Sequence, residues 1–390
     1  MFSSRTNWDL TPNRLAAELA RMRARGREVL DLTESNPTRC GFKYGNRTIL
    51  QALARPGSLQ YHPDPRGMAP AREAVADYYR NRGGGAASLR VDPERILLAA
   101  STSEAYSFLF RLLCEPGDQV LAPAPSYPLF EFLAGLNDVE LAPYPLVYDH
   151  GWQIDLHSVA SAITARSRAL VVVNPNNPTG SFVKPRELAA LNRLCAARGL
   201  ALVADEVFLD YAHQGRARPS LAANRQVLTF ALSGLSKISV LPQMKLAWAV
   251  VNGPKPEVRG AMARLEVIAD TYLSVNTPAQ LALPVLLAQR KSIQAQIRRR
   301  IAANRRELTR QLASHLARRV LKSEGGWYAV LRVPVMGPDE ELALTLLRKR
   351  AVFVHPGHFY GFAGEGHLVL SLLVPEGRFQ EGLRRLLATG

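Results

Sequence analysis

Apolar segments that alternate with helical patterns constrain the fold of this 390-residue chain most strongly. Between residues 90 and 252 the sequence predicts seven short strands, at Arg95–Ala99, Gln119–Ala122, Val139–Pro143, Ala169–Val173, Leu200–Ala204, Val227–Leu232 and Leu246–Val251. Helical patterns lie between them at Ser103–Cys114, Asp155–Thr164 and Pro185–Arg198. Several strands are continuous apolar runs, which are typical of strands buried on both faces. We therefore expect an α/β fold, with a mostly parallel (mixed) sheet flanked by helices and right-handed crossovers.

The rest of the chain predicts a second, smaller α+β domain. After residue 275 come a long helical region, a strand at Trp327–Val333, a helix around Glu340–Lys349, strands at Val352–Val354 and Leu368–Leu373, and a last helix from Glu376. A helix at Arg14–Arg25 is expected to pack with this domain. The expected division is a large domain at residues 46–274 and a small domain made of residues 1–45 and 275–390. Three consecutive glycines at residues 83–85 predict a local loop.

The chain is strongly basic, with 49 Lys and Arg against 33 Asp and Glu, a net charge of +16. Much of this charge lies in residues 290–319, where apolar residues recur at intervals of four or seven, at Ile293, Ile297, Ile301, Leu308, Leu312 and Leu316. This pattern predicts one long amphipathic helix with a basic, solvated face. No zinc-finger, RNP-like or basic-zipper motif accompanies it, so we expect no nucleic-acid partner. Such a field can still attract anionic small molecules.

Composition also bears on the compartment. No apolar run approaches the roughly 20 residues that span a bilayer, and the first ten residues lack the apolar stretch of a secretory signal. The three cysteines, Cys40, Cys114 and Cys195, are too scattered for a disulfide framework or a zinc site. We therefore expect a soluble cytoplasmic protein without a membrane partner or a bound metal.

Polar residues follow four of the predicted strands directly. They are Ser101-Thr102-Ser103, the turn Asn174-Pro175-Asn176-Asn177-Pro178-Thr179-Gly180, Asp205-Glu206 and Ser233-Gly234-Leu235-Ser236-Lys237. Each segment alone is ordinary turn or helix-cap chemistry. Ligands of open α/β sheets bind beyond the carboxyl ends of the strands. Together the four segments therefore predict one site with a hydroxyl-lined helix N-terminus, an amide, a carboxylate and an amine.

The chain resembles the class I/II aminotransferases, the fold-type I enzymes that use pyridoxal 5′-phosphate. The resemblance runs from about Tyr61 to Gly366, and it rests on the turn ending at Gly180, on Asp205-Glu206 and on Ser236-Lys237. The resemblance implies that Lys237 forms a Schiff base with the cofactor. It also implies that Asp205 keeps the pyridine nitrogen protonated.

Further cofactor contacts follow from the same resemblance. Asn177 matches the family's donor to the phenolic oxygen, and Tyr127 matches the aromatic residue that stacks on the ring. Phosphate binding is implied for a helix N-terminus and its neighbours, at Ser101, Thr102, Ser103, Ser236 and Lys245. Tyr61 resembles the tyrosine that reaches the phosphate from the other subunit, which implies a homodimer.

The sequence departs from the family at three positions. Lys245 stands where an arginine often grips the phosphate, and Phe208 replaces a tyrosine that also bonds the phenolic oxygen. Val369 replaces the arginine that clamps the substrate carboxylate. Three explanations stay open for Val369: a substitute cation, a substrate without an α-carboxylate, or a shifted alignment of the last strand. The candidate cations are Arg39, Lys43 and Lys245, and His358 is a further candidate for substrate contact.

We therefore interpret the chain as a pyridoxal-phosphate aminotransferase that moves an amino group between an amino acid or related amine and a keto acid. The substrate itself is not predicted. An alternative on the same fold is a carbon–sulfur β-lyase or a decarboxylase, because the same cofactor supports each outcome. A further alternative is a non-catalytic DNA-binding regulator of this fold. Such regulators carry a helix-turn-helix domain ahead of the aminotransferase-like part. Only one helix precedes the family pattern here, which argues against that alternative.

Overall fold

A mixed sheet of eight strands forms the centre of the larger part of the molecule. The computed structural model describes residues 1–82, 88–213, 217–335 and 337–388, so the glycine loop expected at residues 83–85 lies outside the described residues. The strand order is β2 (Ile96–Ala99), β9 (Ala247–Asn252), β8 (Thr229–Gly234), β7 (Ala201–Asp205), β6 (Ser167–Val173), β3 (Gln119–Ala124), β4 (Glu140–Tyr148) and β5 (Trp152–Ile154). All seven strands expected between residues 95 and 251 are present, with their ends shifted by a few residues, and β5 was not expected.

Six of the eight strands run in the same direction. The pairs β3–β4, β3–β6, β6–β7 and β7–β8 are parallel, whereas β9 lies antiparallel to both β8 and β2, and β5 lies antiparallel to β4. The expected mostly parallel, mixed sheet is therefore confirmed. The carboxyl ends of β2, β3, β6, β7 and β8 meet at one edge of the sheet. Because β9 is reversed, its amino end lies at the same edge.

Helices cover both faces of this sheet. Helices α4 (Thr102–Leu113) and α9 (Lys255–Tyr272) pack on one face. Helices α3 (Ala69–Arg80), α6 (Leu156–Ala162), α7 (Pro185–Arg198) and α8 (Leu235–Ile238) pack on the other. In β2, for example, Leu97 and Ala99 contact the first set of helices, while Ile96 and Leu98 contact the second. Burial on both faces explains why these strands read as continuous apolar runs.

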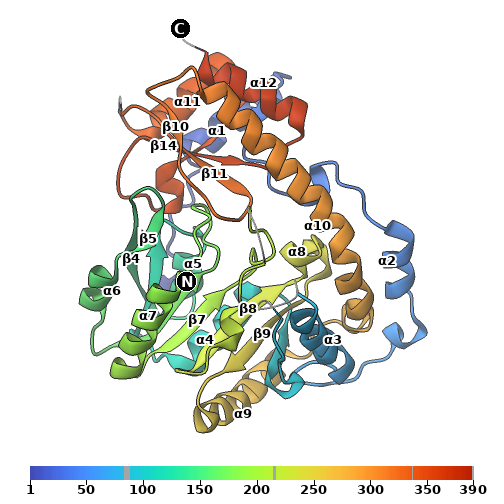
Figure 1. Ribbon diagram of the computed structural model, residues 1–390. Helices are drawn as coiled ribbons and strands as arrows, with labels where there is room; N and C mark the ends of the chain where they lie inside the picture. Colours follow the sequence, from blue (N-terminus) through green and yellow to red (C-terminus); the bar gives the residue numbers. More distant parts are fainter. Residues whose placement is uncertain (83–87, 214–216, 336, 389–390) are drawn as a thin grey trace.

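A smaller α+β part lies above the strand edge (Figure 1). Its antiparallel sheet has the order β10 (Arg319–Val320), β11 (Tyr328–Arg332), β14 (His367–Ser371) and β13 (His355–Pro356). A separate parallel pair joins β1 (Leu30–Asp31) to β12 (Val352–Phe353). Helices α1 (Arg14–Ala24), α11 (Asp339–Arg350) and α12 (Glu376–Leu387) share one apolar core with these strands. The N-terminal helix therefore packs with the small α+β part, as expected.

The 36-residue helix α10 (Thr277–Leu312) runs from the large sheet to the small part (Figure 1). Ile293, Ile297 and Ile301 are buried along it, as their spacing predicted. The amphipathic pattern was expected to continue to residue 319, and this was wrong. The helix ends at Leu312, so Leu316 lies past the last turn and is fully exposed.

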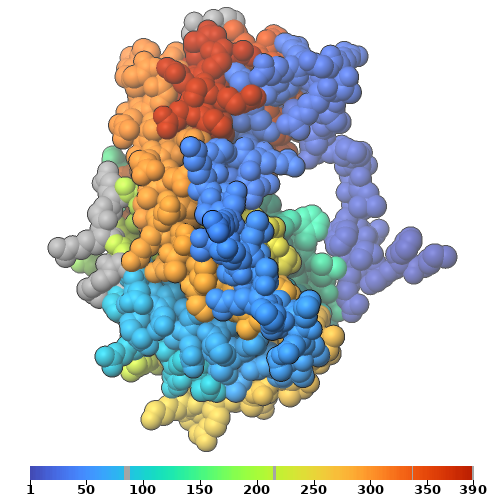
Figure 2. Space-filling model, turned by 90° about the vertical axis from the view of Figure 1, so that its right-hand side faces the viewer, coloured from blue at the N-terminus to red at the C-terminus, as the bar shows by residue number. Residues whose placement is uncertain are grey.

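Two short helices complete the fold, α2 (Asn46–Leu53) and α5 (Phe130–Gly135). Figure 2 shows the segment around α2 lying along α10, and it shows the N-terminal residues standing out from the body of the molecule. Across the described ranges, no helix combines the length and the apolar character that crossing a bilayer requires.

Candidate active site

Lys237 lies in α8, directly after the carboxyl end of β8. Gly234 makes this placement possible, because a Cβ at that position would lie 2.8 Å from the Cβ of Ala247 on the neighbouring strand. The Lys237 amine lies 5.0 Å from the centroid of the Trp327 ring and 5.5 Å from that of Phe208. Burial lowers the pKa of this amine to about 8, although the charge of Asp205 opposes the shift. Lys237 is therefore an amine that loses its proton far more readily than an ordinary lysine.

Asp205 ends the adjacent strand β7 and is buried. Its carboxylate accepts hydrogen bonds from the backbone N–H of Val207 at 3.2 Å and from the Tyr106 hydroxyl at 3.3 Å. Burial nevertheless raises the pKa of Asp205 to about 6, while these bonds and the charge of Lys237 act in the opposite direction. The carboxylate is thus ionised at neutral pH and can accept a further donor.

Glu206, the next residue, has a different environment. Its carboxylate accepts hydrogen bonds from the Asn174 amide at 3.1 Å, from the Leu221 backbone N–H at 2.8 Å and from the Ser220 hydroxyl. These bonds tie the strand end to the segment that follows it. Of the two neighbouring acids, Asp205 is therefore the one that the structure leaves available to a ligand.

The turn after β6 presents one uncommitted amide. Asn174 bonds to Glu206 and Val183, and Asn176 bonds to Ser126 and Thr179. Asn177 is also buried, but its Oδ1 has no hydrogen-bond partner among the described residues. An unpaired polar atom in a buried position is costly, and a ligand group that donates a hydrogen bond to Oδ1 would satisfy it.

Gly180 closes this turn with a φ of +71°. A Cβ there would lie 2.3 Å from the backbone oxygen of Gly325, so a close approach of two backbones requires glycine. The Gly180 carbonyl accepts the backbone N–H groups of Glu324 and Gly325. The turn thereby holds the segment that leads directly to Trp327.

The N-terminus of α4 faces the same strand edge. Ser101 caps the helix by accepting the backbone N–H of Glu104 at 3.1 Å, and the Glu104 carboxylate accepts that of Ala100 at 2.6 Å. The first N–H groups of a helix, here those of Thr102 and Ser103, have no partner within the helix. Such N–H groups are a favourable site for an anion.

The other predicted cofactor residues differ in their exposure. Ser236 is half-buried beside Lys237, and Lys245 is exposed two residues before β9, at a φ of +50°. Tyr127 follows β3, and burial and the negative charge of Asp205 raise its pKa. Tyr61 lies on the surface with 62% of its area exposed. This chain therefore brings Ser236, Lys245 and Tyr127 to the strand edge but leaves Tyr61 outside it.

Strands β11, β13 and β14 of the small α+β part form the opposite wall. Val369 lies in β14 opposite Val330 and His355, and Ser371 lies opposite Tyr328. Because residues two apart in a strand share a face, these side chains lie on one face of the sheet. Leu368 and Leu370 lie on the other face, in the core of the small part.

This wall carries polar groups in place of the family's arginine. Val369 is buried. His355 Nδ1 lies 3.1 Å from the Tyr360 hydroxyl, and burial lowers the pKa of His355. Tyr328 bonds to Ser35, which brings the segment containing residues 34–40 to the same wall.

The candidate substrate residues are exposed. Arg39 ends a short 3-10 helix, Pro37–Arg39, and its side chain is exposed. Lys43 is exposed too, and its backbone is held to α10 by two hydrogen bonds with Gln296. His358 is exposed and lines a cavity of about 460 Å³ together with Tyr127 and Tyr360.

Sequence reasoning did not single out several residues that contact the amine or the carboxylate or that belong to the opposite wall. They are Tyr106, Trp327, Tyr328, His355 and Tyr360. Each belongs to an apolar or aromatic pattern that reads as ordinary core packing. Only the rotation of α4 and the register of β11, β13 and β14 turn them toward the strand edge.

The chain matches the family model described as aminotransferase class I and II over residues 28–386. It is 26% identical to the glutamate-pyruvate aminotransferase AlaA of Haemophilus influenzae over 379 residues, covering 95% of this chain and 92% of that protein. It is 31% identical to the aspartate/prephenate aminotransferase of Thermus thermophilus over 375 residues, covering 95% and 93%.

Solved structures show the same likeness. The alanine aminotransferase of Pyrococcus furiosus superimposes with a TM-score of 0.89 at 23% identity, covering 99% of this chain and 98% of that one. A double mutant of the aspartate aminotransferase of Thermus thermophilus gives a TM-score of 0.84 at 27% identity, covering 99% and 98%. The chain therefore belongs to the class I and II aminotransferase family.

Proposed function

We propose that this aminotransferase uses pyridoxal 5′-phosphate, held at the edge where the strands end. One observation carries the proposal: a buried amine and a buried carboxylate, Lys237 and Asp205, lie on adjacent strand ends within reach of each other's charge. The uncommitted Asn177 amide and the N-terminus of α4 fit the remaining polar groups of the cofactor. When bound, the cofactor supplies an aldehyde and a ring that withdraws electrons from the substrate's α-carbon.

Each residue then has a defined task. Asp205 holds a proton on the ring nitrogen, because an ionised carboxylate favours the protonated form of its partner. Asn177 bonds to the phenolic oxygen, while Lys245 and the α4 N-terminus bind the phosphate. Lys237 would hold the aldehyde, and its amine when free would take the proton from the substrate's α-carbon. Trp327 and Phe208 exclude water around this amine.

Transamination requires an amino donor and a keto-acid acceptor. The relatives are named for glutamate and pyruvate, for alanine, and for aspartate and prephenate. We infer that the donors of this chain fall in the same class of α-amino acids. A panel of alanine, glutamate and aspartate, each with pyruvate or 2-oxoglutarate, tests this inference. Release of ammonia or carbon dioxide without any need for an acceptor would instead favour the lyase or decarboxylase alternative.

The pKa of Lys237 gives a test of the amine itself. In protein freed of cofactor, we expect reductive methylation by formaldehyde and cyanoborohydride to modify Lys237 with a pH midpoint near 8. A lysine in a model peptide titrates near 10.4 and serves as the reference. Asp205→Asn should lower the midpoint further, because the carboxylate favours the charged amine. The rate is read by mass spectrometry of the Lys237 peptide, and a midpoint above 10 would contradict the proposed environment.

We also propose that the protein is a homodimer with shared active sites. The segment that contains Tyr61 is joined to residues 272–274 through Asp64, whose backbone N–H donates to the Ser274 hydroxyl at 2.9 Å. Both segments expose large apolar side chains, with Leu59 at 94%, Tyr61 at 62% and Leu273 at 70%. An exposed apolar patch of this kind is typical of a protein interface. A second subunit that covers this patch would receive Tyr61 at its own strand edge.

Subunit complementation tests the shared site. We expect Lys237→Ala and Tyr61→Ala each to be nearly inactive alone, and a mixture to regain activity after subunit exchange. One of the two sites in a hybrid dimer then has both Lys237 and Tyr61 intact. A control uses Leu50→Ala in place of Tyr61→Ala. Leu50 is also an exposed apolar residue, but it lies on α2, and this variant should be active by itself. Absence of recovery after exchange has been demonstrated would show that Tyr61 does not act across the interface.

We propose further that Arg39 replaces the missing carboxylate clamp. The side chain is exposed and has neither an ion pair nor a hydrogen bond within the described residues. The bond between Ser35 and Tyr328 brings its segment against the wall that contains Val369. A guanidinium matches a carboxylate better than an ammonium does, which favours Arg39 over Lys43.

The clamp is tested by comparing an α-amino acid with its decarboxylated amine. We expect Arg39→Ala to lose preference for the acid by roughly 2–4 kcal/mol in relative kcat/KM, the scale of a charge pair broken on one side. Arg47→Ala, which removes an exposed arginine of α2, is the matched control and should change nothing. If the wild-type protein prefers the acid and Arg39→Ala behaves like the control, another group holds the carboxylate. If the wild type prefers the amine, the substrate class is wrong.

A further inference from the structure

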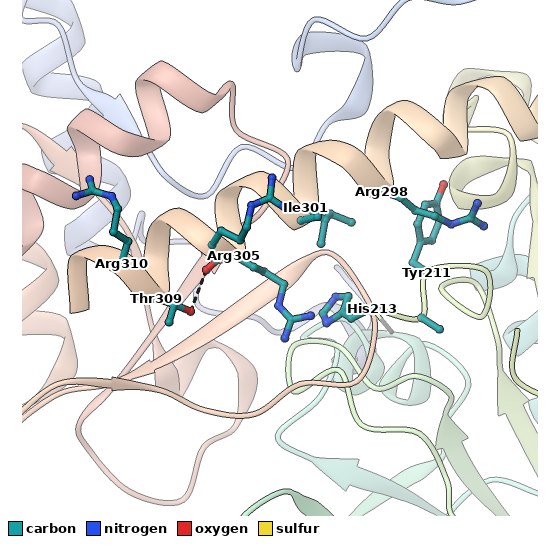
Figure 3. Close-up of a pocket in the computed structure, with 10 residues that line it drawn as sticks. Tyr211, His213, Arg298, Ile301, Arg305, Thr309 and Arg310 are labelled. Atoms are coloured by element: carbon teal, nitrogen blue, oxygen red, sulfur yellow. Dashed lines mark hydrogen bonds between the residues drawn. The ribbon is translucent and has the colours of Figure 1, made fainter. Parts of the chain in front are cut away.

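A second cavity lies away from the strand edge, between the C-terminal half of α10 and residues 211–213 (Figure 3). We call it the α10 cavity, and it has a volume of about 560 Å³. Its polar lining consists mainly of Arg298, Arg305, Arg306 and Arg310 from the helix, and of Tyr211 and His213 from the facing segment. Figure 3 shows these two walls, with the arginines carried by α10 and His213 opposite them.

The described residues neutralise only part of the charge of this cavity. Arg310 pairs with Glu307, at 2.8 Å and 2.6 Å, which compensates one of the four arginines. Arg298 donates only to neutral oxygens, those of the Asp210 backbone and the Gln294 side chain. Arg305 and Arg306 form no ion pair with any residue that the structure describes. The lining itself includes no acidic side chain from the described ranges.

Arg305 is the least satisfied of these groups. Its guanidinium is partly buried, makes no hydrogen bond to the described residues, and has its pKa lowered by that burial. Burying a charge without a partner is unfavourable. A bound anion would remove this cost, and the forked geometry of guanidinium groups suits oxyanions with several oxygens.

The facing wall is built from firmly held, uncharged groups. His213 Nε2 lies 2.9 Å from the Gly326 carbonyl oxygen, and the His213 backbone N–H donates to the Glu324 carbonyl at 2.8 Å. Burial lowers the pKa of His213 to about 4, so the ring is neutral at physiological pH. The Tyr211 hydroxyl donates to the Lys237 carbonyl at 2.7 Å. The wall is thus fixed in place, and the arginines supply all the charge of the cavity's described lining.

We propose that the α10 cavity binds a compact oxyanion with several negative charges, such as a phosphate ester or a polycarboxylate. Its volume lies within the usual range for small-molecule sites. Arg298, Arg305 and Arg306 supply three uncompensated cations within less than three turns of one helix. These charges line one concavity, which favours a small anion over an extended polyanion that would need a stripe along the surface. This site does not depend on the proposed cofactor.

Titration calorimetry tests the proposal with pyrophosphate and with citrate as separate probes. The protein is first saturated with pyridoxal 5′-phosphate so that the phosphate site at the strand edge is filled, and ionic strength is kept constant with sodium chloride. We expect saturable binding of at least one probe, with one anion per chain. The tighter of the two probes identifies the ligand as a phosphate or a polycarboxylate.

Matched variants separate the cavity from the general positive field. We expect Arg305→Gln to weaken binding by about tenfold or more, the effect of losing a hydrogen bond to a charged group. Arg305→Lys, which keeps the charge, should weaken binding less. Arg299→Gln removes the same charge from an exposed arginine of α10 outside the cavity and should bind like the wild type. Melting curves of each variant establish that it is folded.

Three outcomes would overturn the proposal. The first is the absence of saturable binding for both probes. The second is an equal loss of affinity in Arg305→Gln and Arg299→Gln, which would assign binding to the field of the helix rather than to the cavity. The third is tight binding of random duplex DNA at physiological salt that pyrophosphate does not displace, which would make the basic face a nucleic-acid surface.

Discussion

The active site depends on burying an amine and a carboxylate close to each other on adjacent strand ends. Burial disfavours the charge of both groups, and the pKa of Lys237 is lowered to about 8 while that of Asp205 is raised to about 6. Each charge limits the shift of the other, so both groups are ionised at neutral pH, but by a small margin. A modest change in the surroundings can therefore move a proton. An acid–base residue needs this property to work near physiological pH.

Neighbouring acids show how specific this arrangement is. Glu206 is satisfied by three hydrogen bonds, and Asp210 is paired with Arg82 at 2.7 Å and bonded to Gln294 at 2.9 Å. Those carboxylates hold strand ends and helices together. Among the described residues the Asp205 carboxylate accepts two longer hydrogen bonds, and Asn177 on the neighbouring turn has an unpaired oxygen. Unsatisfied polar groups in a folded protein often mark a ligand site, and here they lie where the parallel strands end.

The fold and the strand-edge residues could be predicted because both follow from short, local patterns in the sequence. Runs such as Ala169–Val173 are apolar throughout because helices cover both sides of the sheet, and the polar residues after them follow from chain order alone. The antiparallel direction of β9 could not be predicted, because an apolar run does not indicate whether its strand is parallel or antiparallel to its neighbours. The end of α10 was missed because the spacing of apolar residues continued past Leu312 by chance.

The opposite wall was less accessible to sequence reasoning. Tyr328, His355 and Val369 come from three different strands, and only their register places them on one face. From the sequence Tyr106 looks like a core residue, because its ring packs in the core against Phe130. Its hydroxyl nevertheless bonds to Asp205. The resemblance to a known family indicated that the carboxylate clamp is absent at Val369. It could not indicate that His355 lies opposite Val369 on the neighbouring strand. Such groups depend on long-range packing, which no local pattern records.

Borohydride reduction followed by peptide mapping tests the central claim most directly. The protein is incubated with pyridoxal 5′-phosphate, reduced and digested, and the labelled lysine is identified by mass spectrometry. We expect one pyridoxyl group per chain on Lys237, because its amine is enclosed, loses its proton near pH 8 and lies beside Asp205. Lys237→Ala should take up no stoichiometric label. A stoichiometric label on Lys245 or on any other lysine would contradict the assignment of Lys237 as the reactive amine.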